Sequence, residues 1–140
     1  MPDDIHEGGC VCGAVRYRTK GAPQAAFVCH CTYCQRASGS AFLVEVAFPK
    51  EAVEIAGGPI GTYEHKSDES GRALYPQFCT RCATKIGMTV ELVPGVQVIF
   101  GGTFDDPNWF DIDRHIFARS AVKWMIYPPD VTVHQKHWLY

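Results

Sequence analysis

Seven cysteines in this chain of 140 residues fall into three short clusters. The clusters are Cys10 with Cys12, then Cys29 with Cys31 and Cys34, and last Cys79 with Cys82. Gaps of one or two residues between cysteines are typical of metal ligands rather than of buried apolar filler. A structural zinc ion takes four protein ligands, and a catalytic one takes three and keeps a position open. Seven thiols therefore divide naturally into four and three.

Composition and charge exclude several other classes of protein. An odd number of cysteines would leave a stray thiol in a disulfide scaffold, which also needs an oxidising compartment. The first six residues, Met1 to His6, carry no export signal, and no stretch approaches the roughly 18 apolar residues that span a bilayer. A net charge of -2 gives no broad basic surface for nucleic acid. We expect a soluble cytoplasmic protein with reduced cysteines, and the oligomeric state is left open.

The pattern of apolar residues predicts a mostly β fold. In residues 14–19 apolar and charged side chains alternate, so Val15 and Tyr17 should face inward while Arg16 and Arg18 face water. Turn residues separate the runs, which favours antiparallel sheets in a small sandwich or partly open barrel, within a single domain over residues 1–140. Further strands are predicted at 26–28, 42–48, 53–55, 62–64, 86–90 and 96–100.

One short helix is predicted over residues 32–38, in a chain where helix is otherwise scarce. Thr32 is a candidate N-cap, and Gly39 is placed to end the helix in a left-handed conformation.

The first and third clusters together predict a four-thiolate site. Cys10 and Cys12 lie on the same side of an extended chain, and the glycines around them let the backbone curl toward one ion. In Cys79 to Cys82 a gap of two residues lets both sulfurs converge on zinc. Such a site would act as a zinc staple between distant segments and would contribute directly to folding. The alternative is that either pair is redox-active or simply buried.

The second cluster predicts a three-thiolate site with a vacant position. Cys29 and Cys31 end a predicted strand and Cys34 begins the short helix, so three sulfurs can converge while His30 alternates away. A remote histidine could still close the site as a fourth ligand. The candidates are His6, His65 and His115. If the position stays open, a soft, sulfur-rich zinc ion of formal charge -1 favours a thiol ligand over hydrolytic chemistry.

Three blocks of sequence resemble the glutathione-dependent formaldehyde-activating enzyme family, which includes the centromere protein V relatives. The blocks are Gly8 to Arg16, Cys29 to Ser40 and Phe78 to Cys82, with weaker echoes at Gly102 to Pro107, His115 to Phe117 and Lys123 with Trp124. One departure is Ala83, where the family usually has glycine.

The resemblance implies a mostly β fold that holds two zinc ions. Cys10, Cys12, Cys79 and Cys82 would hold a structural zinc, while Cys29, Cys31 and Cys34 would hold a catalytic one. It also implies reversible addition of glutathione to formaldehyde, a carbon–sulfur lyase reaction when read backward. The partners would then be a small thiol and an aldehyde, with glutathione as co-substrate. The alternative is a non-catalytic zinc module that binds a thiol or a protein partner.

Several other residues are candidates for contacts with such a substrate. Arg36, just beyond Cys34 on the predicted helix, is the choice for a glutathione carboxylate, because arginine forks suit carboxylates. A proton donor is not identifiable, although three histidines and four aromatic residues are worth tracing. They are His30, His65 and His115 as donors, and Trp109, Phe110, Trp124 and Tyr127 as pocket walls.

Overall fold

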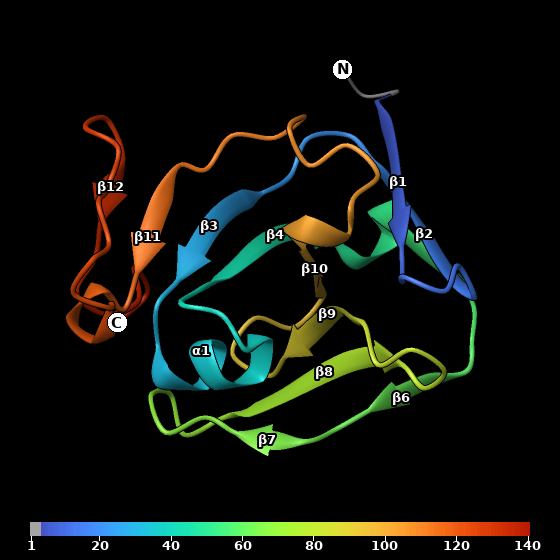
Figure 1. Cartoon of the computed structure of the whole chain (residues 1–140), viewed down its shortest axis with the longest axis horizontal. Coiled ribbons are helices and arrows are strands. Elements are labelled where there is room, and N and C mark those ends of the chain that lie inside the picture. Colours follow the sequence, from blue (N-terminus) through green and yellow to red (C-terminus); the bar gives the residue numbers. More distant parts are fainter. Residues whose placement is uncertain (1–3) are drawn as a thin grey trace.

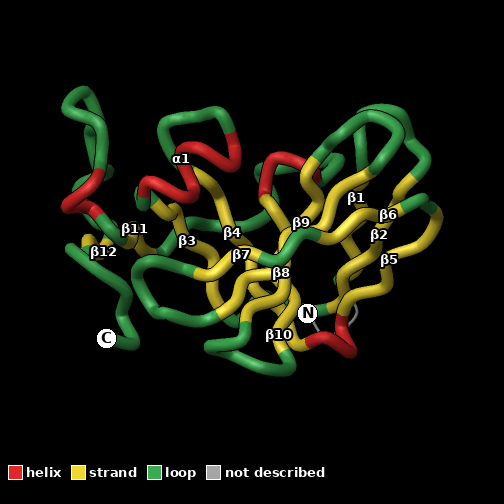
Figure 2. Tube along the Cα trace, turned by 90° about the horizontal axis from the view of Figure 1, so that it is seen from below, coloured by secondary structure: helices red, strands yellow, loops and turns green. Residues whose placement is uncertain are grey.

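The computed structural model describes residues 4–140. Strands run through the whole length of the molecule, with only short helical segments between them (Figures 1 and 2). The helical segments are α1 Thr32–Ser38, η1 Lys50–Ala52, η2 Gly101–Thr103 and η3 Ala118–Ser120. The strands are β1 Ile5–Gly9, β2 Val15–Lys20, β3 Ala25–Cys29, β4 Leu43–Pro49, β5 Val53–Gly57, β6 Ile60–Thr62, β7 His65–Lys66, β8 Ala73–Cys79, β9 Lys85–Val90, β10 Val96–Phe100, β11 Arg114–Ile116 and β12 Thr132–Val133.

The described strands form two sheets. The smaller sheet has the order β1-β2-β5, and the larger has the order β12-β11-β3-β4-β10-β9-β8-β6, with β7 also paired to β8. The strands β11 and β12 lie at one end of the molecule, and β1 and β2 lie at the other (Figure 1). The predicted mostly β fold with antiparallel sheets is confirmed, except that β11 pairs with both of its neighbours in parallel. That the chain is a single domain stays a prediction.

The two sheets pack over one apolar core. As the alternation in β2 predicts, Val15 and Tyr17 are buried, while Arg16 and Arg18 are exposed. These two side chains pack against Val46, Phe48 and Ile99 from one face of the larger sheet. The other face of the larger sheet is left free to form a cavity, described below.

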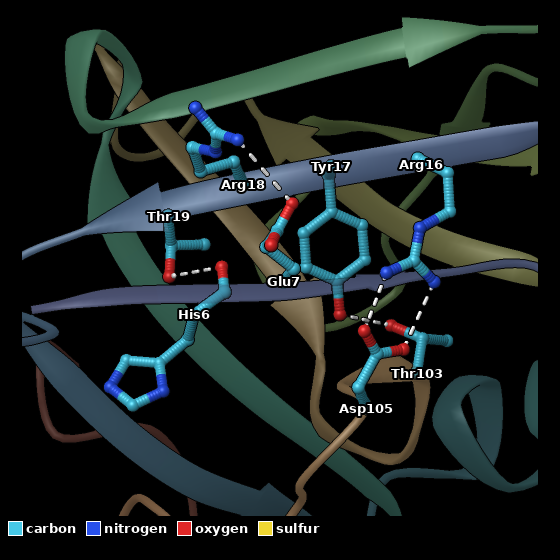
Figure 3. A network of polar contacts seen from close by, with 8 residues as sticks. All are labelled: His6, Glu7, Arg16, Tyr17, Arg18, Thr19, Thr103 and Asp105. Carbon is cyan, nitrogen blue, oxygen red and sulfur yellow. Dashed lines mark hydrogen bonds and ion pairs between the residues drawn. The ribbon is translucent and has the colours of Figure 1, made fainter.

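A polar network fastens the smaller sheet to the segment after β10 (Figure 3). The Tyr17 hydroxyl lies 2.7 Å from the Thr103 hydroxyl, and Arg16 forms a two-pronged ion pair with Asp105. Gly8 in β1 allows this approach, because a Cβ there would lie 2.3 Å from both the Thr103 carbonyl oxygen and the Tyr17 hydroxyl. A Cβ at Gly9 would likewise lie 2.3 Å from the Val15 carbonyl oxygen. The two glycines that weaken the strand signal of β1 are thus required by its close packing.

Most predicted strands are found within one or two residues of their expected ends, but five strands were missed. These are β1, β7, β8, β11 and β12. The prediction of a strand over 62–64 was wrong, since residues 63 and 64 lie between β6 and β7. Pro76 hides β8, because proline normally argues against an internal strand. The Pro76 carbonyl accepts a hydrogen bond of 3.1 Å from the Tyr63 N–H, in the gap between β6 and β7. Because the N–H and C=O of a strand residue point to the same side, the missing N–H of Pro76 faces this gap and not β9.

The helix α1 has the predicted bounds but a different N-cap. The prediction of Thr32 as N-cap was wrong: Cys31 occupies that position, and its sulfur accepts a hydrogen bond of 3.3 Å from the Cys34 N–H. Thr32 is the first residue of the helix proper. Gly39 ends the helix with φ of 67°, in the left-handed region as predicted.

Candidate metal and substrate site

The first and third cysteine clusters meet as one group of four sulfurs. Cys10 and Cys12 stand in the turn between β1 and β2, and Cys79 and Cys82 stand at the turn between β8 and β9. The Cys12 sulfur lies 3.6 Å from the Cys10 sulfur and 3.8 Å from the Cys79 sulfur. Four sulfurs placed tetrahedrally at 2.3 Å from zinc would lie about 3.8 Å apart. The spacing therefore suits a tetrahedral thiolate site.

The second cluster forms a separate group of three sulfurs, all buried. Cys29 ends β3, Cys31 caps α1 and Cys34 lies in the first turn of that helix. Their sulfur atoms lie within 4.8 Å of one another, and none of the seven cysteines is in a disulfide. The structure thus brings together the four and the three sulfurs that the spacing indicates, and each group could hold a metal ion.

The three buried thiols differ in pKa. Hydrogen bonds from Cys29 and Cys34, and from backbone N–H groups, lower the pKa of Cys31 to about 3. The pKa values of Cys29 and Cys34 are raised, first by hydrogen bonds within the trio and then by burial. A cluster that already stabilises one thiolate is poised to receive a divalent cation, whose charge would displace the remaining protons.

Glu45 is a functional candidate that the sequence analysis missed. This residue of β4 is 4% exposed, and its Oε2 lies 3.7 Å from the Cys34 sulfur. Burial raises the pKa of Glu45 to about 8. In sequence Glu45 looks like an ordinary surface charge in an apolar strand. Only the pairing of Glu45 with Phe27 in β3 reveals that its side chain shares a sheet face with Cys29.

The three histidines that could have closed the second site as a fourth ligand lie elsewhere. His6 stacks on Trp109 with ring centroids 3.7 Å apart, and His65 stacks on Tyr33 at 4.4 Å. His115 is buried, and its Nδ1 lies 2.8 Å from Nε2 of His30. Among the described residues, no histidine joins the group of three sulfurs.

His30 turns away from the sulfurs on either side of it, as the sequence analysis expected. It is fully buried, and its Nδ1 has no hydrogen-bond partner within the described part of the chain. Burial lowers the pKa values of both His30 and His115. The pair is therefore held neutral behind the site.

A cavity of about 360 Å³ opens beside the three sulfurs. Its floor is one face of the larger sheet, since strand pairing places Phe27, Glu45 and Val98 on the same side as Cys29. Its walls come from the start of α1, the loop 67–70 and the last four residues, 137–140. The C-terminal segment is held beside β11 by a hydrogen bond of 3.0 Å from the Phe117 N–H to the Lys136 carbonyl. The volume is in the range of small-molecule sites.

The structure places the other sequence candidates outside this cavity. Arg36 is exposed on α1 and does not line it. Trp109 and Phe110 pack against the core between the sheets, Trp124 is 69% exposed, and Tyr127 contacts the buried histidine pair. None of the three candidate proton-donor histidines lines it either. The aromatic wall is made instead by residues that were not singled out, and these are Phe27, Tyr33, Phe117, Trp138 and Tyr140.

Comparison with solved structures agrees with this fold. A crystal structure of a Rhodobacter sphaeroides protein superposes with a TM-score of 0.57 at 16% identity, covering 71% of this chain and 87% of that chain. At this identity the likeness concerns the fold alone. The comparison with curated proteins gave no match.

A mostly β fold with clustered thiols beside a cavity defines a class of small sulfur-rich proteins. The model of the family described as "Glutathione-dependent formaldehyde-activating enzyme" matches residues 5–120. The chain belongs to this family, and the resemblance noted in the sequence is thereby confirmed. The match covers both groups of cysteines, whereas the C-terminal segment that walls the cavity lies beyond it.

Proposed function

We propose that this protein is a zinc-dependent carbon–sulfur lyase that acts on adducts of glutathione with an aldehyde, in the manner of an S-hydroxymethylglutathione synthase. Family membership supports a formaldehyde-activating function related to glutathione. The observation that carries the proposal is the group of three buried thiols in the wall of a cavity large enough for a small molecule.

The two groups of cysteines would then hold two zinc ions with different roles. Cys10, Cys12, Cys79 and Cys82 offer four thiols, the donor set of a closed structural site. Cys29, Cys31 and Cys34 offer three, the number found in catalytic sites. A zinc ion bound by these three sulfurs would keep a substrate thiol deprotonated near neutral pH, so that it stays nucleophilic.

The residues around the trio would bind and orient the reactants. Holding a thiol and an aldehyde together in one cavity converts a reaction between two molecules into one within a complex, which is worth roughly 7–11 kcal/mol in the best model systems. Trp138 and Tyr140 line the cavity and would limit the access of water to the reactants. Glu45 lies at the trio and lines the cavity, so its carboxyl can exchange a proton with the substrate oxygen.

Arg36 would bind a carboxylate of the glutathione portion outside the cavity, since it is exposed on the helix that carries Cys34.

Seven free thiols favour a reducing compartment, and we place the protein in the cytoplasm on that ground. None of the helices among residues 4–140 is long and apolar enough to cross a bilayer.

The test is the exchange rate between free and adducted glutathione in the presence of formaldehyde, measured by NMR. Because thiols add to formaldehyde without help, the rate is compared with and without micromolar zinc-loaded protein. Faster exchange that disappears in Cys31→Ser supports the proposal. Unchanged exchange, with zinc bound at both sites, would reject catalysis and leave a zinc module that binds a thiol or a protein.

A further inference from the structure

The cavity beside the three sulfurs is apolar over most of its lining. The sheet face that forms its floor carries four apolar side chains, and these are Phe27, Met88, Val98 and Ile116. Met88 is 5% exposed, Val98 is 4% exposed and Ile116 is 2% exposed. Two ionisable side chains also stand on this face, Glu45 beside the three sulfurs and Arg114 in β11. A ligand that fills the cavity would therefore meet mostly hydrocarbon.

Three carboxyl side chains and one guanidinium line the cavity, but few of these groups are both buried and free. Glu69 is already paired with Arg119, and Asp68 is exposed. The cavity's histidine, His137, has a pKa lowered to about 4 by burial. The guanidinium is that of Arg114, which already donates to Asp113 at 2.8 Å and stacks over Trp138 at 4.5 Å. No unengaged cation therefore remains among the lining residues to receive a carboxylate.

Glutathione and formaldehyde fit these walls poorly. Glutathione carries two carboxylates, and neither would meet a free cation among the lining residues. Burying a carboxylate without a partner is strongly unfavourable. Formaldehyde has a single carbon and would leave nearly all of the 360 Å³ unfilled.

We infer that the cavity binds an apolar group, aliphatic or aromatic and free of carboxylates, attached to the carbon–sulfur unit that reacts at the trio. This inference rests on the proposed lyase function and names its substrate class. The reaction is R–SH plus R′–CHO giving R–S–CH(OH)–R′. The carbon–sulfur bond forms, and the thiol proton ends on the former carbonyl oxygen. Nothing is oxidised or reduced.

The apolar group can belong to the thiol or to the aldehyde, and both have the same chemistry inside the cavity. In one arm of the test, benzyl mercaptan is the thiol and formaldehyde the aldehyde. In the other arm, glutathione is the thiol and benzaldehyde the aldehyde, so that the tripeptide stays outside and only the ring enters. The exchange rate between free and adducted thiol is measured by NMR with and without protein in both arms. If the protein accelerates this exchange more in either arm than it does for glutathione and formaldehyde, the inference is supported and the source of the apolar group is identified.

Binding is measured independently of turnover with ¹³C-methyl methionine NMR. Met88 lies in the cavity lining and should shift when benzyl mercaptan binds, whereas Met125, in the segment between β11 and β12, should not. The matched probe is benzyl mercaptan bearing a carboxylate in the para position. Because the carboxylate would lose its hydration without meeting a free cation, we expect the affinity of this probe to be at least about tenfold weaker.

A cavity-filling variant adds a genetic test. Val90→Phe places a larger side chain in the cavity and should weaken benzyl mercaptan binding by at least about tenfold, since the added ring occupies the ligand's space. Ile126→Phe, at a side chain 87% exposed outside the cavity, is the matched control and should bind as the parent does. If Val90→Phe does not fold, the comparison of the two mercaptans on the parent protein still decides.

The inference would be overturned if the carboxylated probe bound as tightly as benzyl mercaptan, or if the Met88 methyl did not respond to either. These outcomes are separate from a failure of the lyase proposal. If no pair of reactants exchanges faster with protein while Met88 still reports selective binding, the lyase reaction is rejected and the apolar binding site stands.

Discussion

Glu45 and Ala83 are residues whose roles follow from their positions and not from their types. Glu45 is a carboxyl side chain on a mostly apolar sheet face, and it lies 3.7 Å from a cysteine sulfur. Ala83 follows the last cysteine and has a φ of 66°, a conformation that suits glycine. Each offers a substitution that isolates a single physical effect.

The first prediction concerns proton exchange by Glu45. Glu45→Gln keeps the shape of the side chain but cannot exchange a proton, so the acceleration of adduct exchange should fall by about 10²–10⁴-fold. Zinc content, measured by atomic emission, should stay at the parent value because all seven thiols remain. Loss of one zinc together with activity would instead show that Glu45 supports metal binding.

The second prediction concerns backbone strain at Ala83. Its side chain is exposed, so Ala83→Gly loses little packing, relieves the left-handed conformation and should raise the free energy of unfolding by about 0.5–1 kcal/mol. The control is Ala56→Gly at an exposed position of β5, where glycine should lower stability. Urea unfolding of both variants measures whether each substitution raises or lowers the free energy of unfolding. Destabilisation of similar size in both would show that Ala83 is unstrained.

At the scale of elements, the helix α1 and the C-terminal segment shape the site. A helix of only 7 residues depends on its ends. At the first end the sulfur of Cys31 caps the helix, and at the second Gly39 satisfies the Gln35 carbonyl with a hydrogen bond of 2.9 Å. The cysteine spacing and the helix start are therefore one structural feature.

The third prediction tests the helix C-cap. Gly39→Ala forces a Cβ into the left-handed region with no atom within 4 Å to clash with, so only backbone strain is added. The free energy of unfolding should fall by about 1 kcal/mol. Gly102→Ala is the matched control, because its surroundings are equally open and its φ is not positive. Equal effects of the two substitutions, in urea unfolding, would contradict the assignment of a left-handed cap.

The fourth prediction concerns the C-terminal cover of the cavity. Burial, and the nearby charges of His134 and Arg114, lower the pKa of His137 to about 4, from an ordinary value of about 6.5. The unfolded segment thus binds a proton more readily than the docked one. The neutral His137 ring therefore stabilises the docked segment fully above about pH 6.5, and this stabilisation is lost as the pH falls toward 4.

Proton NMR of the His137 ring should report this low pKa, and Trp138 fluorescence should change in the same pH window, because the two rings stack at 4.1 Å. His137→Gln removes the titrating group and should flatten the fluorescence change. A His137 pKa at or above 6.5 would show that the segment is not docked as described.

At the scale of the whole molecule, the two groups of cysteines have different structural consequences. The group of four joins the turn after β1 to the turn after β8, and so links the smaller sheet to the larger one. The group of three lies within β3 and the adjoining helix. Only the first group closes a long loop of the chain, so its metal should contribute more to global stability.

The fifth prediction compares one cysteine from each group. Cys79→Ser should lose one zinc and lower the free energy of unfolding by about 5 kcal/mol or more, which is enough to unfold many domains. Cys31→Ser should lose the other zinc and the activity while the chain stays folded. Metal analysis and circular dichroism distinguish the two. Equal unfolding of both variants would contradict the division into structural and catalytic sites.

The sequence by itself determined the local features of this protein. Cysteine spacing defined the group of three and the two separate pairs, alternation placed Val15 and Tyr17 in the core, and Gly39 marked the end of the helix, because each of these depends on residues close together in the chain. The meeting of the two pairs in one group depends on the tertiary structure. Pairings between distant strands decided the rest. The register that joins Phe27 to Glu45 put a carboxyl beside Cys34, and the return of residues 137–140 along β11 roofed the cavity. Such contacts bring together residues far apart in sequence, so no local pattern encodes them, and they alone give the site its lining and its charge.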